Sequence, residues 1–76
     1  MKLSDLKVGD VHTDREGDDW IIVKNPISGE DPIQATLEDV LCQHNDDLTD
    51  MAGETEMDII AVHRDGVEIY RRLEEK

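Results

Sequence analysis

The chain has 76 residues, with 20 Asp and Glu residues against 8 Lys and Arg residues, so its formal net charge is −12. This length allows one small domain with a thin core, and it excludes a nucleotide-binding βαβ array or an α/β barrel. Phosphate backbones and anionic lipids repel so acidic a chain, so we expect no direct binding to nucleic acid or to membranes. Residues 1–76 are therefore expected to form a single domain.

The cysteine and the apolar runs indicate a cytoplasmic protein. A single cysteine, Cys42, excludes an internal disulfide and a thiolate-based structural zinc site. Because Cys42 follows Val40 and Leu41 in an apolar stretch, we expect a buried and unreactive thiol. No apolar run reaches the roughly 18–20 residues that a membrane span needs, and the N-terminus lacks the core of a signal peptide.

The first part of the chain predicts two strands joined by a tight turn. Residues 11–14 form the first expected strand, Gly17 lies in the turn at 15–18, and residues 20–24 form the second strand. Four consecutive apolar residues beginning at Trp20 predict a strand that is buried on both faces, or covered on one face by a helix. Asn25-Pro26 is expected to end this strand, and a second turn is expected at 28–32, which contains Ser-Gly and Asp-Pro.

Residues 33–44 have the features of a short strand and of a helix start. Apolar residues at 33, 35 and 37 alternate with polar ones, as in a strand. Thr36 and Asp39 have the spacing of a capping box, which begins a helix. We therefore expect a strand at 33–36 and a helix at 37–44, with an apolar helix face made by Leu37, Val40, Leu41 and His44.

The last part of the chain predicts an acidic loop and a second hairpin. In the loop at 45–56, Leu48 and Met51 are the expected inward anchors. Asp65-Gly66 follows the expected strand at 57–63 and is a strong hairpin signal, because a type I′ turn needs positive φ at both central positions. A two-residue turn predicts the following cross-strand pairs: Val62 with Ile69, Ile60 with Arg71, His63 with Glu68, and Ala61 with Tyr70.

Five short strands and one short helix predict a mainly β fold of the α+β class. We expect a small, bent antiparallel sheet arranged as an SH3-like half-open barrel. The exposed edges of its hairpins also favour a homodimer.

Five short motifs are spread along the chain, and their order is the basis of a resemblance. They are Asp5-Leu6-Lys7-Val8-Gly9, Trp20-Ile21-Ile22-Val23, His44-Asn45-Asp46-Asp47-Leu48, Asp58-Ile59-Ile60-Ala61-Val62 and Ile69-Tyr70-Arg71-Arg72. In this order the chain resembles small uncharacterised proteins of phages and prophages of Gram-positive bacteria. The resemblance implies a phage origin, a β-rich fold and a place in the host cytoplasm, and it supplies no catalytic residues.

No arrangement of residues predicts catalysis. His12, His44 and His63 lack the short spacings of a metal site, and the acidic loop lacks the register of a calcium loop. Adjacent carboxylates such as Asp18-Asp19 are expected by chance in so acidic a chain, and none lies in an apolar stretch that would raise its pKa. We therefore expect a protein that is not an enzyme and that has no cofactor or metal.

The charge is the remaining feature that points to a function. A net charge of −12 is larger in magnitude than the net charge of about 2–8 that is sufficient to keep a small domain soluble. Carboxylates on a rigid sheet can imitate a phosphate backbone, so we expect a protein partner with a basic surface. The protein itself would then be an inhibitor of a host defence complex, similar to anti-CRISPR proteins. The candidate partner-binding residues are Asp14, Glu16, Asp18, Asp19, Asp46, Asp47 and Asp50.

Three alternatives stay open. An adaptor or structural phage protein would use an apolar patch around Trp20 and Tyr70 instead of charge. A sponge for a signalling nucleotide would need basic groups, which are few in this chain. The acidic surface could also reflect only a salt-adapted composition.

Overall fold

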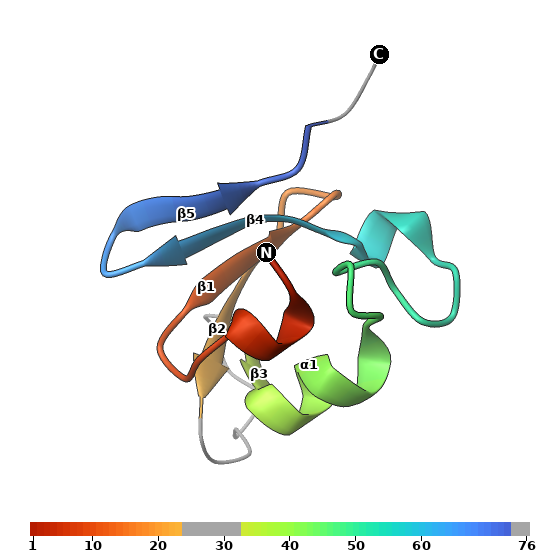
Figure 1. The fold of residues 1–76 in the computed structure, drawn as a ribbon, viewed down its shortest axis with the longest axis horizontal. Helices are drawn as coiled ribbons and strands as arrows, with labels where there is room; N and C mark the ends of the chain where they lie inside the picture. Colours follow the sequence, from red (N-terminus) through yellow and green to blue (C-terminus); the bar gives the residue numbers. More distant parts are fainter. Residues whose placement is uncertain (24–32, 74–76) are drawn as a thin grey trace.

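The computed structural model describes residues 1–23 and 33–73, which form a five-stranded sheet with one α-helix and two 3-10 turns (Figure 1). The helix α1 covers Leu37–Gln43, and the 3-10 turns η1 and η2 cover Leu3–Asp5 and Thr55–Met57. The expected turn at 28–32 and the last residue of the expected strand at 20–24 lie outside the described residues. The strands are β1 (Val11–Asp14), β2 (Asp19–Val23), β3 (Gln34–Thr36), β4 (Ile59–Arg64) and β5 (Val67–Arg71).

The sheet is mixed and open, with the strand order β3-β2-β1-β4-β5. The two hairpin pairs β1–β2 and β4–β5 are antiparallel, as predicted, and β1 also pairs antiparallel with β4, which joins the two hairpins. The pair β2–β3 is parallel, with Ile22 opposite Ala35, so the prediction of a wholly antiparallel sheet is wrong. Within the described residues β3 and β5 do not pair with each other, so the sheet is not closed and the barrel stays a prediction.

Local sequence signals set the start of α1 and the second hairpin, as predicted. The Oγ1 atom of Thr36 accepts a hydrogen bond from Asp39 N at 3.1 Å, and Asp39 Oδ2 accepts one from Thr36 N at 2.9 Å. This reciprocal capping box satisfies two backbone donors at the start of the helix. At the hairpin, Asp65 and Gly66 have φ values of 54° and 79°, as a type I′ turn requires.

A bulge changes the register of the second hairpin. His63 faces Glu68 as predicted, but the register shifts between Val62 and His63, so that Val62 faces Tyr70 instead of Ile69. The extra residue brings Tyr70 over the core, against which it packs. The predicted pairs Ile60–Arg71 and Ala61–Tyr70 are wrong for the same reason, because Ala61 faces Arg71.

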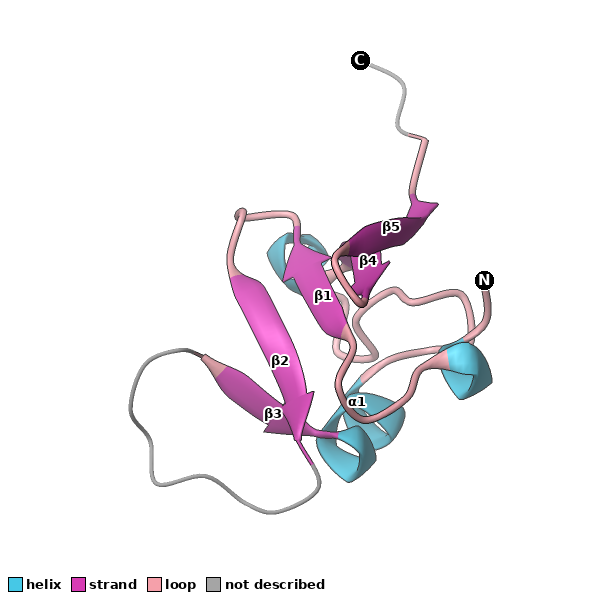
Figure 2. Ribbon diagram, turned by 90° about the vertical axis from the view of Figure 1, so that its left-hand side faces the viewer, coloured by secondary structure: helices cyan, strands magenta, loops and turns pink. Residues whose placement is uncertain are grey.

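The core fills the space between the sheet and the segments that cover it. Ile22, Val40, Leu48, Ile59 and Val62 are all at most 2 % exposed. Figure 2 shows α1 beside β1, β2 and β3, while β5 forms the opposite edge of the sheet. In the described part of the chain, no helix has both the length and the apolar character needed to cross a bilayer.

Three residues that were expected to point inward are exposed. Leu41 and Met51 are 44 % and 57 % exposed, and Cys42 is exposed as well. The helix α1 is only seven residues long and buries only Val40 completely, so its narrow inner face leaves Leu41 and Cys42 outside. Of the two inward anchors predicted for the following loop, only Leu48 is confirmed, because it is fully buried.

An ion pair between a buried carboxylate and a half-buried arginine joins the start of the sheet to the second hairpin. The Nε and Nη2 atoms of Arg64 donate to the two carboxylate oxygens of Asp10 at 2.8 Å each. The Arg64 guanidinium keeps the pKa of Asp10 below its ordinary value, although burial of this carboxylate opposes the shift. Asp10 therefore stays ionised while it is 1 % exposed.

Candidate functional site

The β1–β2 turn is held by a buried carboxylate. Asp14 is 1 % exposed and accepts hydrogen bonds from Trp20 Nε1 at 2.9 Å and from Asp18 N at 3.0 Å. The prediction that Asp14 contributes to an exposed acidic surface is therefore wrong. Because Asp14 satisfies the indole N–H and a backbone N–H of the turn, it fixes the position from which Glu16 and Asp18 project.

An ion pair connects this turn to the segment around η2. Arg15 Nη1 donates to Asp58 Oδ2 at 2.7 Å and also to the carbonyl oxygen of Thr55. Asp58, 5 % exposed, accepts a second hydrogen bond from Asp50 N at 2.7 Å. Burial raises the pKa of Asp58, but the hydrogen bonds from Asp50 N–H and Arg15 outweigh it and hold the pKa below its ordinary value. Asp58 is thus a buried, charged anchor for both segments.

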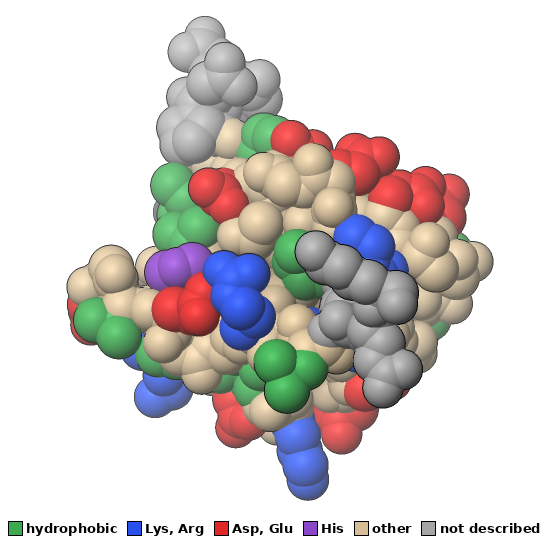
Figure 3. Space-filling model, turned by 90° about the horizontal axis from the view of Figure 1, so that it is seen from above, with side chains coloured by type: hydrophobic (Ala, Val, Ile, Leu, Met, Phe, Trp, Pro, Cys, Tyr) green, Lys and Arg blue, Asp and Glu red, His purple; other side chains and the backbone are tan. Residues whose placement is uncertain are grey.

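The result is a cluster of exposed carboxylates, which we call the acidic end: Glu16, Asp18, Glu54 and Glu56. Arg15 is the only basic residue in the two segments 15–18 and 54–58, and it bonds to the buried Asp58. Seen from above, the densest group of Asp and Glu side chains lies at the upper right, on the side of the molecule where η2 lies in Figure 1 (Figure 3). Glu16 and Asp18 were predicted here. Glu54 and Glu56 were missed because they lie beside the turn only through long-range contacts, namely the β1–β4 pairing with Asp14 opposite Ile59 and the Arg15–Asp58 ion pair.

Asp19 and Asp50 take part in local hydrogen bonds. Asp19 Oδ1, on β2, accepts a hydrogen bond from Thr13 Oγ1 at 2.6 Å. Asp50 is half-buried, and its Oδ2 atom accepts from Ala52 N at 3.0 Å and from Glu54 N at 3.1 Å. Asp50 therefore shapes the loop that presents Glu54.

Asp46 and Asp47 are exposed, but they lie next to the N-terminal segment and next to Arg72. Leu3 N donates to the carbonyl oxygen of Asp46 at 3.0 Å, and Arg72 Nη2 donates to that of Asp47. The hydrogen bonds from the Thr49 hydroxyl and backbone N–H lower the pKa of Asp47. The seven predicted carboxylates thus do not form one surface: Glu16 and Asp18 belong to the acidic end, and Asp46 and Asp47 belong to a second exposed site.

Trp20 and Tyr70 do not form an open apolar patch. Both side chains are half-buried and pack against the core, and they come from β2 and β5, which β1 and β4 separate. The exposed apolar side chains of this region lie on β5, where Val67 and Ile69 are 62 % and 38 % exposed. An adaptor function would therefore depend on β5 and not on the residues that the sequence suggested.

The fold brings two of the three histidines together. The rings of His12 and His44 meet edge to face, with 6.3 Å between their centroids. His63 lies on β4, where its Nε2 atom is 3.9 Å from Glu68 Oε1. Among residues 1–23 and 33–73, no group of three or more His, Cys, Asp or Glu side chains is arranged to hold a metal ion.

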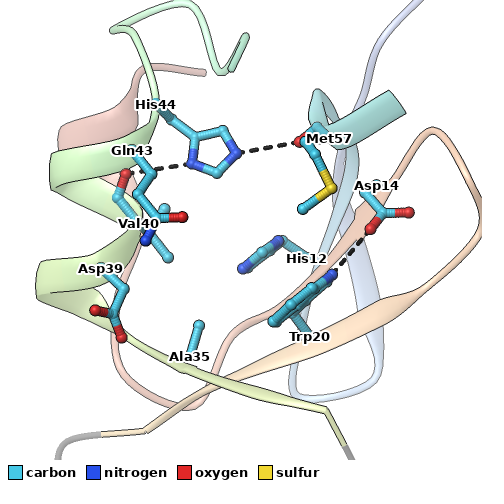
Figure 4. A pocket seen from close by; sticks show the side chains of 9 residues that line it. All are labelled: His12, Asp14, Trp20, Ala35, Asp39, Val40, Gln43, His44 and Met57. Atoms are coloured by element: carbon cyan, nitrogen blue, oxygen red, sulfur yellow. Dashed lines mark hydrogen bonds between the residues drawn. The ribbon is translucent and has the colours of Figure 1, made fainter. Parts of the chain in front are cut away.

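A cavity of about 30 Å³ lies between α1 and the strands β1 and β2. Figure 4 shows the His12 and Trp20 rings on the strand side and Val40, Gln43 and Asp39 on the helix side. The alternation of side chains along β1 is one sequence signal of this cavity. His12 and Asp14 lie two residues apart and alternate with half-buried residues, so both point to the core face. The cavity itself depends on how α1 lies over the sheet.

Comparisons of the chain with protein-family models, with curated proteins and with solved structures found no match. The resemblance to small phage proteins therefore stays a prediction from the order of the short motifs.

Proposed function

We propose that this protein is not an enzyme and acts by binding a basic protein partner through the acidic end. The observation that supports this function is the exposure of Glu16, Asp18, Glu54 and Glu56 on two segments that the Arg15–Asp58 ion pair holds together. Carboxylates on anchored segments lose little conformational entropy when they bind, and their field steers a basic partner into contact.

In its sharper form the proposal concerns a basic groove that normally binds nucleic acid. Carboxylates of the acidic end would occupy the positions of phosphates in that groove. Such an inhibitor of a host defence complex agrees with the motif order shared with phage proteins, and it would act in the cytoplasm of the host cell. The net charge of −12 favours fast association with a basic surface and repels nucleic acid itself.

A capture experiment with charge-matched variants tests the site. The tagged chain is incubated with host lysate at low and at high salt, and the recovery of captured protein is compared with that of the double variant Glu54→Gln, Glu56→Gln. A control variant, Glu38→Gln with Asp65→Asn, removes the same number of charges from exposed positions outside the candidate partner-binding residues, and Asn-Gly suits the hairpin turn as well as Asp-Gly does. We expect recovery to fall with salt and with the acidic-end variant, and to stay close to wild type with the control.

Other outcomes distinguish the alternatives. Equal losses in both variants would show that net charge matters and that the acidic end is not a specific site. Capture that does not depend on salt would exclude the electrostatic proposal and favour an adaptor, for which a charged substitution at Ile69 on the exposed β5 strand should abolish binding.

A further inference from the structure

We propose that the cavity between α1 and the strands β1 and β2 binds a small uncharged molecule through a hydrogen bond to His12. This site is separate from the acidic end and does not depend on the function proposed above. His12 is 4 % exposed, and neither of its ring nitrogens has a hydrogen-bond partner among the described residues. Two unpaired polar atoms in the interior are costly, so a molecule that pairs with them is favoured.

The other rings around the cavity already have partners. Trp20 donates its indole N–H to Asp14 at 2.9 Å, and its ring lies parallel to that of His12 with an interplanar angle of 2°. The two ring nitrogens of His44 face the carbonyl oxygens of Val40 at 3.3 Å and Met57 at 3.1 Å. His12 is therefore the ring that is left to recognise a molecule in the cavity (Figure 4).

The size and the charge of the cavity define the class of ligand. A volume of about 30 Å³ has room for about two water molecules or for a planar molecule of a few non-hydrogen atoms. The carboxylates of Asp14 and Asp39 line the cavity and repel anions. Burial, with His44 adding to the effect and Asp14 opposing it, lowers the pKa of His12 to about 4, so the ring is neutral near pH 7.

A neutral imidazole has one N–H donor and one nitrogen acceptor. The matching ligand is a small, planar, uncharged amide that carries a donor next to an acceptor. Formamide, with three non-hydrogen atoms, has these properties and is a suitable probe. Formate, which has the same number of non-hydrogen atoms but is charged, is the matched negative control.

Nuclear magnetic resonance of the full chain tests the site. Formamide is titrated into the ¹⁵N-labelled protein at pH 7, and the ring nitrogens of His12 and His63 are followed in long-range ¹H–¹⁵N spectra. We expect saturable shifts at His12 with half-saturation on the order of 10 mM, the range that three well-placed non-hydrogen atoms reach. Formate should leave His12 unchanged, and the half-exposed His63 should respond to neither compound.

The variant His12→Phe keeps a ring in this place and removes both nitrogens. Formamide should bind this variant about tenfold more weakly, as followed by the backbone amides of Val40 and Met57. Unchanged affinity in the variant would show that His12 does not recognise the ligand, and an equal response to formate would contradict the selectivity for uncharged molecules. Shifts that do not saturate would mean that the cavity holds solvent only. If the variant does not fold, the titration of the wild-type ring nitrogens decides alone.

Discussion

Acidification should destabilise this protein through His12 before its anchoring carboxylates are protonated. Burial lowers the pKa of the His12 imidazole from its ordinary 6.5 to about 4, and the nearby His44 ring adds to the effect. In the unfolded chain the imidazole keeps its ordinary pKa. As the pH falls through 6.5, the unfolded state therefore binds a proton that the folded state does not bind until about pH 4.

The size of the effect follows from the separation of the two pKa values. A difference of about 2.5 between the two pKa values, at about 1.4 kcal/mol for each pKa unit, lowers the free energy of unfolding by roughly 3.5 kcal/mol. The loss is absent well above pH 6.5, grows as the pH falls to about 4 and stays constant below that value. A core of this size rarely supplies more than about 3–5 kcal/mol of net stability, so the loss is a large fraction of the total.

Urea unfolding followed by Trp20 fluorescence measures this loss between pH 7 and about pH 4.5. The variant His12→Phe cannot take up the proton, so its stability should decline less than that of wild type over this range. The pKa values of Asp10 and Asp58 lie below the ordinary 3.8, so the stability that these carboxylates provide is lost only at lower pH. His63→Gln serves as a control at a half-exposed histidine, and its pH profile should follow wild type. Parallel profiles for wild type and His12→Phe would refute the reasoning.

Three further predictions concern anchoring and exposure. Arg15→Met removes a donor from the buried Asp58 and should lower the free energy of unfolding by about 2 kcal/mol in urea titrations. The control is Arg71→Met, which removes an exposed ion pair, and a loss in Arg15→Met no larger than in this control would contradict the prediction. Thr36→Ala removes the helix cap and should lower the free energy of unfolding by about 1 kcal/mol in the same titrations, whereas Thr36→Ser, which keeps the capping hydroxyl, should keep the stability close to that of wild type. Cys42 is exposed, so a thiol reagent should label it in the native protein nearly as fast as in urea, and strong protection would show that the thiol is buried.

The elements that depend on neighbouring residues could be predicted from the sequence. The capping box of Thr36 and Asp39 and the turn at Asp65 and Gly66 act over two to four residues, and both occur in the structure. Their physical cause is local, because a backbone N–H without a helical partner and a positive φ each favour particular residue types. The same holds for the strand at 11–14, which matches β1.

Features that depend on contacts between distant residues could not be predicted. The parallel β2–β3 pair, the bulge opposite His63 and the exposure of Cys42 depend on how whole elements pack. Residue type alone does not distinguish a carboxylate that faces solvent from one that faces the core, so Asp14 was predicted at the surface although it is buried and accepts a hydrogen bond from Trp20.

By itself the sequence determined the charge of −12, the class of the fold and the local starts and turns, because these follow from composition and from contacts within a few residues. Only the tertiary structure decided which carboxylates form a surface. The pairing of β1 with β4 sets Asp14 opposite Ile59, and Arg15 reaches Asp58 across 43 residues of chain. Together these contacts place the turn that carries Glu16 and Asp18 beside the segment that carries Glu54 and Glu56. The placement of α1 relative to β1 is also a tertiary feature. It leaves His12 buried beside a cavity, and the His12 ring nitrogens have no hydrogen-bond partner among the described residues.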